Sequence, residues 1–237
     1  MICHLCLEEK KLINAHIIPK SFFIPLRSEN IAPKIHSNTK GEYPQKTQTG
    51  IYDNSILCAE CDGIIGVWDN YAQQLLLKDF TEKQAVYSGG NKAAYKIDDF
   101  DYHKLKLFFI SVLWRASISN HKFYNRVILG PYEEEARNMI LANEPGPEDD
   151  FAVVVAKFSD PEFKGMLDPH LDRYENINFY RFYMTGFVVY IKVDKRNTPE
   201  FMNRFKISNG YPLWIILRDL HESKDGDLFK KMARNKT

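Results

Sequence analysis

Two short stretches, CHLC at residues 3–6 and CAEC at residues 58–61, contain all four cysteines of this 237-residue chain. Each has the C-x2-C spacing, in which two thiolates on one tight turn can reach the same metal ion. Zinc accepts four thiolates in tetrahedral geometry and imposes no geometric preference of its own. The spacing therefore predicts one structural Zn2+ site, and the alternative is four unrelated thiols. The predicted ligands are Cys3, Cys6, Cys58 and Cys61.

The composition is that of an ordinary folded protein with a rather aromatic interior, with 44% hydrophobic, 14% aromatic and 27% charged residues. The first residues, Met1-Ile2-Cys3, leave no room for a signal peptide, and no run of about 18 apolar residues occurs. We therefore expect a soluble, cytoplasmic protein with no membrane contact. In a reducing compartment, paired cysteines favour metal binding over disulfides.

The formal net charge of +1 gives no global argument for nucleic-acid binding. One region is locally basic, because residues 101–130 contain a single acid, Asp101. A basic surface and a solvated helix face explain this region equally well. Its basic residues are Lys104, Lys106, Arg115, Lys122 and Arg126.

After the second cysteine pair, the apolar residues of 67–76 have the spacing of an amphipathic helix. The pair Gly89-Gly90, with polar neighbours, is the clearest break in the pattern. We therefore predict a zinc-binding domain over residues 1–86, a linker over 87–100 and a second domain over 101–237.

The second half predicts helices packed on an antiparallel sheet. Residues 102–118 are apolar nearly all round and predict a buried helix, and Pro131 begins another that ends near Ala142. Met184-Thr185-Gly186 predicts a hairpin turn, and a basic tail at residues 230–236 is expected to fray. The fold class is thus α+β. Strands rich in β-branched and aromatic residues are predicted at 151–157, 177–183, 187–193 and 213–217.

Between the cysteine pairs, the chain has 51 residues, more than the roughly 15–20 of a simple zinc ribbon. Cys3-x2-Cys6, His16-Ile17-Ile18-Pro19-Lys20 and Asn54-Ser55-Ile56-Leu57-Cys58-Ala59-Glu60-Cys61-Asp62 together resemble the zinc-bearing branch of the HNH, or ββα-metal, endonuclease superfamily. The resemblance covers about residues 1–75. It implies an N-terminal zinc-bound ββα-metal-like domain, in which the zinc is structural.

The resemblance also implies a set of catalytic residues. His16 corresponds to the general base, which accepts the proton of the attacking water. Asn54 corresponds to the middle asparagine, one residue closer to the second cysteine pair than usual, and positions a loop or the imidazole. Asp62 corresponds to the last ligand of a catalytic Mg2+ or Mn2+ ion. From the residues alone, base catalysis is the preferred reading of His16, and a structural role and, after it, zinc ligation stay open; for Asp62 a helix N-cap stays open.

One position departs from the family pattern. The superfamily has an acid or histidine directly before the base histidine, and this chain has Ala15, which cannot coordinate a metal ion. Asp53, Asp69 or His4 are candidates to replace it in space. Whether the chain is an enzyme therefore stays open at the sequence level.

The HIIPKSFF stretch at residues 16–23, followed by Trp68-Asp69, is similar to a group of uncharacterised bacterial proteins, which often have a small or polar residue before the histidine. We expect an HNH-like, metal-dependent endonuclease that hydrolyses DNA, in a setting such as phage defence. The alternative is a non-catalytic zinc module that recognises nucleic acid or protein. The C-terminal domain would supply target recognition or a protein-partner surface.

Three further features have plainer readings that the sequence favours. Asp168-Pro169-His170-Leu171-Asp172 presents ligand-type side chains at alternate positions, but a polar loop is the better interpretation. Arg115 is interpreted as a snorkelling side chain on a core helix. The aromatic residues at 179–183 are interpreted as sheet packing before nucleobase stacking.

Overall fold

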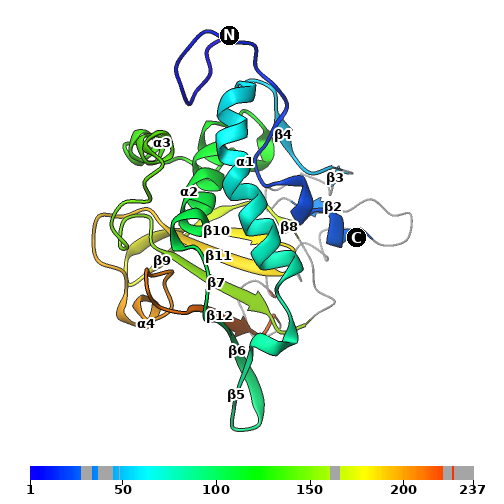
Figure 1. The fold of residues 1–237 in the computed structure, drawn as a ribbon, viewed down its shortest axis with the longest axis vertical. Coiled ribbons are helices and arrows are strands. Elements are labelled where there is room, and N and C mark those ends of the chain that lie inside the picture. Colours follow the sequence, from blue (N-terminus) through cyan, green and yellow to red (C-terminus); the bar gives the residue numbers. More distant parts are fainter. Residues whose placement is uncertain (28–33, 37–44, 48, 161–165, 221–225, 227–237) are drawn as a thin grey trace.

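The structure is a computed structural model that describes residues 1–27, 34–36, 45–47, 49–160, 166–220 and 226. Its centre is a seven-stranded sheet, with the helices α1 (Ala59–Gln73), α2 (Tyr102–Ile118) and α3 (Tyr132–Ala142) on one side of it (Figure 1). α2 packs between α1 and α3 and contacts the sheet. The predicted basic tail at residues 230–236 lies outside the described residues.

The sheet has the order β5-β6-β12-β7-β11-β10-β9. Neighbouring strands run antiparallel except for β7 and β12, which pair in parallel. The fold is therefore α+β with a mostly antiparallel sheet, as the sequence predicts. The strands are β5 (Ala85–Ser88), β6 (Asn91–Ile97), β7 (Val153–Phe158), β9 (His170–Tyr174), β10 (Ile177–Met184), β11 (Phe187–Lys192) and β12 (Leu213–Arg218).

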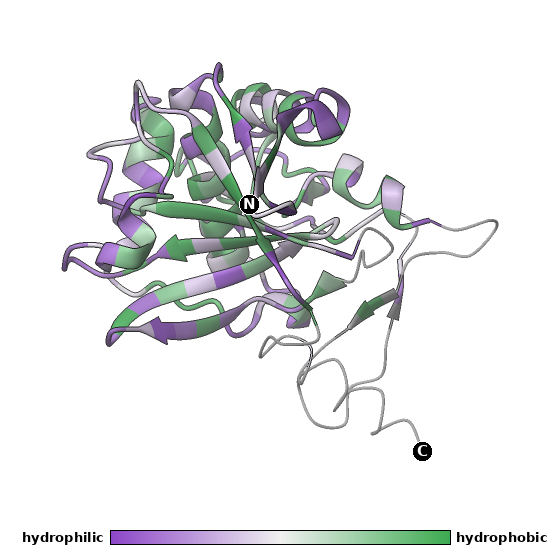
Figure 2. Cartoon of the chain, turned by 90° about the horizontal axis from the view of Figure 1, so that it is seen from below, coloured by the Kyte–Doolittle hydropathy of each residue, from purple (hydrophilic) through white to green (hydrophobic). Residues whose placement is uncertain are grey.

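Alternation along the strands divides the apolar residues between the two faces of the sheet. Val153 and Val155 of β7 belong to the large core under the helices, whereas Val154 and Ala156 belong to a smaller cluster on the opposite face. Period-two patterning produces this division because successive side chains of a strand point to opposite faces. Both faces are thus covered, and the strands in the middle of the molecule are strongly hydrophobic (Figure 2).

The helices predicted from periodicity are confirmed. α2 spans the predicted residues 102–118, and the side chain of Asp101 caps it by accepting a hydrogen bond from the Lys104 amide at 3.0 Å. α3 ends where Asn143 takes the left-handed conformation, with φ of 53°. The predicted hairpin turn also forms, because Thr185 and Gly186 both have positive φ and connect β10 to β11.

The linker predicted at residues 87–100 is not found. These residues contain the end of β5, the turn at Gly89-Gly90 and all of β6, which pairs with β12 inside the main sheet. The two glycines have φ of 57° and 80°, so they make a hairpin turn and not a flexible connection. One continuous hydrophobic core also joins residues of the N-terminal segment to residues of the sheet.

The predicted loop at residues 168–172 is also wrong in part, because His170–Tyr174 forms the edge strand β9 beside β10. Pro169 precedes the strand, where its missing N–H costs no ladder hydrogen bond. A second, three-stranded sheet joins distant parts of the chain in the order β3-β2-β8. Its strands are β2 (Lys34–His36), β3 (Gln45–Lys46) and β8 (Met166–Leu167).

The locally basic region is less basic at the surface than its sequence suggests. Lys106 and Arg115 are buried, whereas Lys122 is exposed. Within the described part of the chain, every helix is too short or too polar to cross a lipid bilayer.

Candidate metal centre and histidine site

The four cysteines come together at the N-terminal end of α1. Their four sulfur atoms all lie within 4.8 Å of one another. Cys58 precedes the first residue of α1 and Cys61 lies in its first turn, while Cys3 and Cys6 belong to a turn in which the Leu7 amide donates to the Cys3 carbonyl at 2.8 Å. Tetrahedral zinc with Zn–S bonds of about 2.3 Å needs sulfurs roughly 3.8 Å apart. The cluster is therefore compatible with a structural metal ion.

The thiols have unequal tendencies to ionise. Burial acts to raise the pKa of Cys3, but hydrogen bonds from backbone amides, including those of Cys6 and Cys58, outweigh this effect. The net result is a pKa lowered to about 7. The Cys58 amide lies 3.4 Å from the Cys3 sulfur. Burial and the neighbouring thiols raise the pKa of Cys61. Four thiolates at this spacing need a compensating cation, which is the situation that a thiolate-binding metal ion satisfies.

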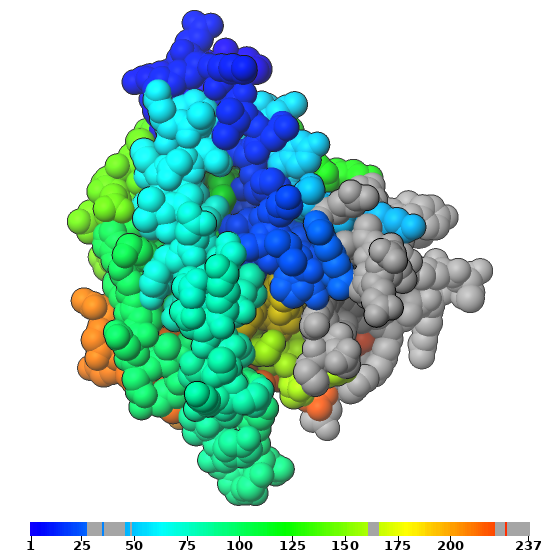
Figure 3. Space-filling model, turned by 45° about the vertical axis from the view of Figure 1, so that its right-hand side comes forward, coloured from blue at the N-terminus to red at the C-terminus, as the bar shows by residue number. Residues whose placement is uncertain are grey.

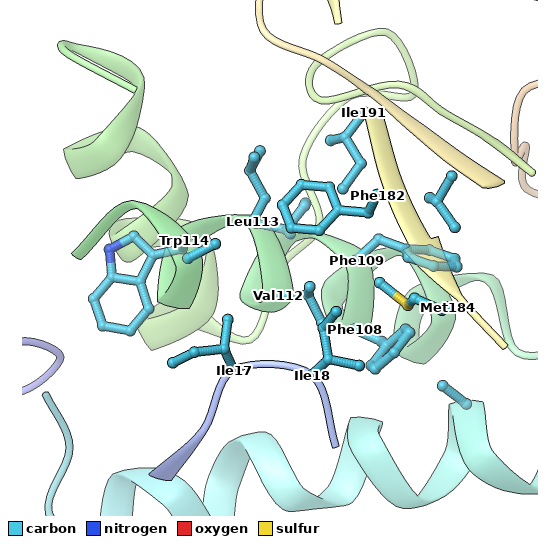
Figure 4. Close-up of a cluster of buried hydrophobic side chains, with 14 of the residues drawn as sticks. Ile17, Ile18, Phe108, Phe109, Val112, Leu113, Trp114, Phe182, Met184 and Ile191 are labelled. Atoms are coloured by element: carbon cyan, nitrogen blue, oxygen red, sulfur yellow. The ribbon is translucent and has the colours of Figure 1, made fainter. Parts of the chain in front are cut away.

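His16 lies on a two-residue strand, and its ring interacts with the charge of Asp62, the residue after Cys61. β1 (Ala15–His16) pairs antiparallel with β4 (Tyr52–Asp53), and α1 follows β4 in the chain. Ile17 and Ile18, which follow His16, are buried under α2 and fix the strand to the core (Figure 4). In the space-filling view this N-terminal segment lies along α1 on one face of the molecule (Figure 3).

One backbone carbonyl orients the imidazole of His16. The Nε2 atom lies 3.0 Å from the Thr49 carbonyl oxygen. A carbonyl only accepts hydrogen bonds, so Nε2 carries the proton and Nδ1 of the neutral ring keeps its lone pair. Burial lowers the pKa of His16, partly opposed by the Thr49 carbonyl and by Asp62. The ring is therefore a neutral proton acceptor near pH 7.

Asp62 lies in the first turn of α1, close enough to His16 for the two charges to interact. Burial raises the pKa of the Asp62 carboxyl, while Arg115 and His16 oppose the shift. The Asp62 amide donates to the Cys58 carbonyl, so Asp62 is inside the helix and is not its N-cap residue. A half-buried carboxylate beside a neutral imidazole is thus a feature of this surface.

Asn54 is exposed at the end of β4. Asp53, the residue before it, makes the hydrogen bonds that stabilise this part of the chain. The Asp53 carboxylate accepts hydrogen bonds from the Ser55 amide, the Ser119 hydroxyl and the Asn120 amide, at 2.8–2.9 Å. These contacts tie the end of β4 to the end of α2. The sequence contained a cue for this role, since an aspartate two residues before a serine is typical of an Asx turn.

The ion pair between Arg115 and Asp69 is the feature that the sequence interpretation missed. Arg115 is only 1% exposed and does not snorkel. Its guanidinium binds the Asp69 carboxylate through two hydrogen bonds and donates to the His16 carbonyl at 2.8 Å. A charged residue on a helix that is apolar nearly all round was the available signal, because a buried guanidinium requires a partner.

None of the three substitutes considered for Ala15 is placed to complete a second metal site. Asp53 is saturated by hydrogen bonds, Asp69 is paired with Arg115, and His4 is exposed in the cysteine turn. Ala15 itself is fully buried opposite Asp53. Among the described residues, the four cysteines are the only group of three or more ligand-type side chains arranged to hold one ion.

Comparison of the chain with protein-family models, with curated proteins and with solved structures finds no match.

Proposed function

We propose that the chain is an HNH-like, metal-dependent endonuclease that hydrolyses DNA phosphodiesters, with His16 as the general base. The observation that carries this proposal is the hydrogen bond from His16 Nε2 to the Thr49 carbonyl, which leaves Nδ1 as proton acceptor on a ring that interacts with the charge of Asp62. A general base must be neutral at working pH and oriented toward its proton donor. The cysteine cluster would hold a structural zinc ion that fixes α1 and therefore Asp62.

In this mechanism His16 removes a proton from a water molecule as the water oxygen attacks phosphorus. The new P–O bond forms while the bond to the leaving oxygen breaks, and the proton goes to Nδ1. The Asp62 carboxylate stabilises the resulting imidazolium through its charge. Asp62 would also hold a Mg2+ or Mn2+ ion, which stabilises charge on the phosphate and leaving oxygen when it is bound.

Asp62 suits a hard cation, because its carboxylate is half-buried and burial disfavours its charged form. A cation would remove that penalty. Magnesium keeps several water ligands in many sites that have one or two protein carboxylates. One protein ligand plus substrate oxygens is therefore consistent with its coordination chemistry.

The test is nicking of supercoiled plasmid and of single-stranded circular DNA with added Mg2+ or Mn2+, comparing wild type with His16→Ala and Asp62→Asn. His103→Ala is the control, because His103 lies in the first turn of α2, whereas Arg115, which contacts His16, lies in its last turn. We expect nicking by wild type and by the control, and a loss of at least about 100-fold in His16→Ala. If wild type and His16→Ala leave both the plasmid and the single-stranded circle intact with several divalent ions, this proposal is wrong.

One observation favours a second candidate, the non-catalytic zinc module that recognises nucleic acid or a protein. No third ligand joins His16 and Asp62 among the described residues, and Asp69 is occupied by Arg115. For this candidate, the protein would retain nucleic acid or a partner without cleaving it. The setting in phage defence rests on the sequence resemblance and is tested by counting plaques on cells that express wild type or His16→Ala.

A further inference from the structure

An exposed aromatic ring lies next to the His16 imidazole. Tyr52 of β4 is directly opposite His16 of β1, so both side chains leave the same face of the strand pair. The two rings meet edge to face, with centroids 5.9 Å apart and an interplanar angle of 62°. Tyr52 is 47% exposed, although its neighbours Ile51 and Asp53 are buried. Its backbone is therefore held firmly while much of its ring is open to solvent.

Of the two cationic side chains considered around His16, one is buried and the other is exposed. Arg115 is buried and its guanidinium is engaged by Asp69 and by the His16 carbonyl. Lys20 lies four residues after His16, as the first residue of the 3-10 helix Lys20–Phe22, and its side chain is exposed. Of these two cations, Lys20 is the one placed to meet an anion from solvent.

We propose that Tyr52 stacks on an unpaired base and that Lys20 contacts an adjoining phosphate, so that the substrate is single-stranded DNA. This inference rests on the proposed function and gives it a substrate class. Base stacking on an aromatic side chain accepts any sequence, because every base has a π-face. In a duplex both faces of a base are covered by its neighbours. A base could reach Tyr52 from a duplex only after unstacking and unpairing.

The test is fluorescence anisotropy with a labelled oligodeoxythymidine of about 12 nucleotides, whose bases are unpaired. A duplex of oligodeoxythymidine with oligodeoxyadenosine is the comparison. Divalent ions and chelators are left out, so that binding is measured without cleavage and without stripping metal from the cysteines. We expect Tyr52→Leu to bind the single strand about tenfold more weakly than wild type, and Tyr52→Phe to bind like wild type.

Tyr211→Leu is the matched control, because Tyr211 is 69% exposed and lies just before β12 of the main sheet, outside the β1–β4 pair. It should bind like wild type. In Lys20→Gln the slope of log Kd against log salt concentration should fall by about one, because one phosphate contact is lost. Circular dichroism of each variant establishes that the fold is kept, and Tyr52→Phe keeps the ring in place if Tyr52→Leu does not fold.

Equal binding by Tyr52→Leu and wild type, equal binding of duplex and single strand, or no binding at low salt would each overturn the inference. The two proposals fail separately. Cleavage that depends on His16 but not on Tyr52 removes the single-strand inference and keeps the nuclease. Binding that depends on Tyr52 with no cleavage in any divalent ion keeps the recognition of unpaired DNA and removes the nuclease.

Discussion

Buried Arg115 and partly exposed Asp69 form an ion pair in which Nη1 and Nη2 lie 2.9 and 2.8 Å from the two carboxylate oxygens. The same guanidinium donates to the His16 carbonyl, so one side chain of α2 joins α1 to β1. The Arg115 guanidinium is 1% exposed and Asp69 is 16% exposed, so removal of Asp69 leaves a buried charge without its partner. The pair is therefore a connection that the candidate site needs in order to keep its shape.

Arg115→Met should destabilise the protein by about 3 kcal/mol, because Asp69 then loses its partner. Asp69→Asn should also destabilise, and the double variant should lose less than the two single losses together. Urea unfolding of the four proteins measures this. A cost below about 1 kcal/mol for Arg115→Met would contradict the role assigned to the pair.

The His16 imidazole should be the Nε2–H tautomer, with a pKa below the usual value near 6.5. Burial disfavours the imidazolium, so the unfolded chain binds this proton before the folded one. The stability from neutral His16 is therefore present above about pH 6.5 and is lost as the pH falls below it. Long-range 1H–15N spectra identify the tautomer and the titration. His16→Gln should lack this loss, and His103→Gln should keep it.

Chelation should release one metal ion per chain and destabilise the N-terminal segment. Structural zinc contributes roughly 10–16 kcal/mol in zinc-finger peptides, and we expect on the order of 5 kcal/mol here because the sheet core does not depend on the ion. Cys3→Ser should reproduce the effect without chelator. Mass spectrometry and thermal unfolding measure metal content and stability. A metal-free wild type with unchanged melting would contradict this prediction.

Lys106 should make stability rise with pH in the alkaline range. Its ammonium is buried on α2 and hydrogen-bonded to the Tyr102 hydroxyl and the Pro147 carbonyl. Burial lowers its pKa to about 8, opposed by Asp150, Glu148 and Asp149 and assisted by Lys206. Between about pH 8 and 10.5 the unfolded chain binds one more proton than the folded chain, so stability increases with pH.

The gain over that range should be about 3 kcal/mol relative to Lys106→Met, which lacks the titrating group. Urea midpoints at pH 7.5 and pH 10 for both proteins provide the comparison. Lys104→Met is the control, because Lys104 is partly exposed on the same helix and its pKa is raised by Asp101. If wild type and Lys106→Met depend on pH in the same way, Lys106 is not the titrating group.

Elements set by local patterning were predicted well, and those set by distant pairing were not. The helix at residues 102–118 and the turn at Thr185-Gly186 follow from periodicity and turn chemistry within a few residues. β6 and β9 were missed, because Asn91–Ile97 and His170–Tyr174 contain many polar residues and become strands through pairing with β12 and β10.

By itself the sequence determined that four cysteines come in two pairs able to share one ion, that α2 is buried, and that His16 follows an alanine. These properties depend on residue chemistry and spacing over a few positions. Only the tertiary structure decided that Thr49 sets the tautomer of His16, that Asp69 is engaged by Arg115, and that Tyr52 lies open beside the imidazole. Each of these involves residues 33 to 46 positions apart, among them His16 with Thr49 and Asp69 with Arg115, or a cross-strand register. Such contacts depend on how the whole chain packs, so local sequence carries little information about them.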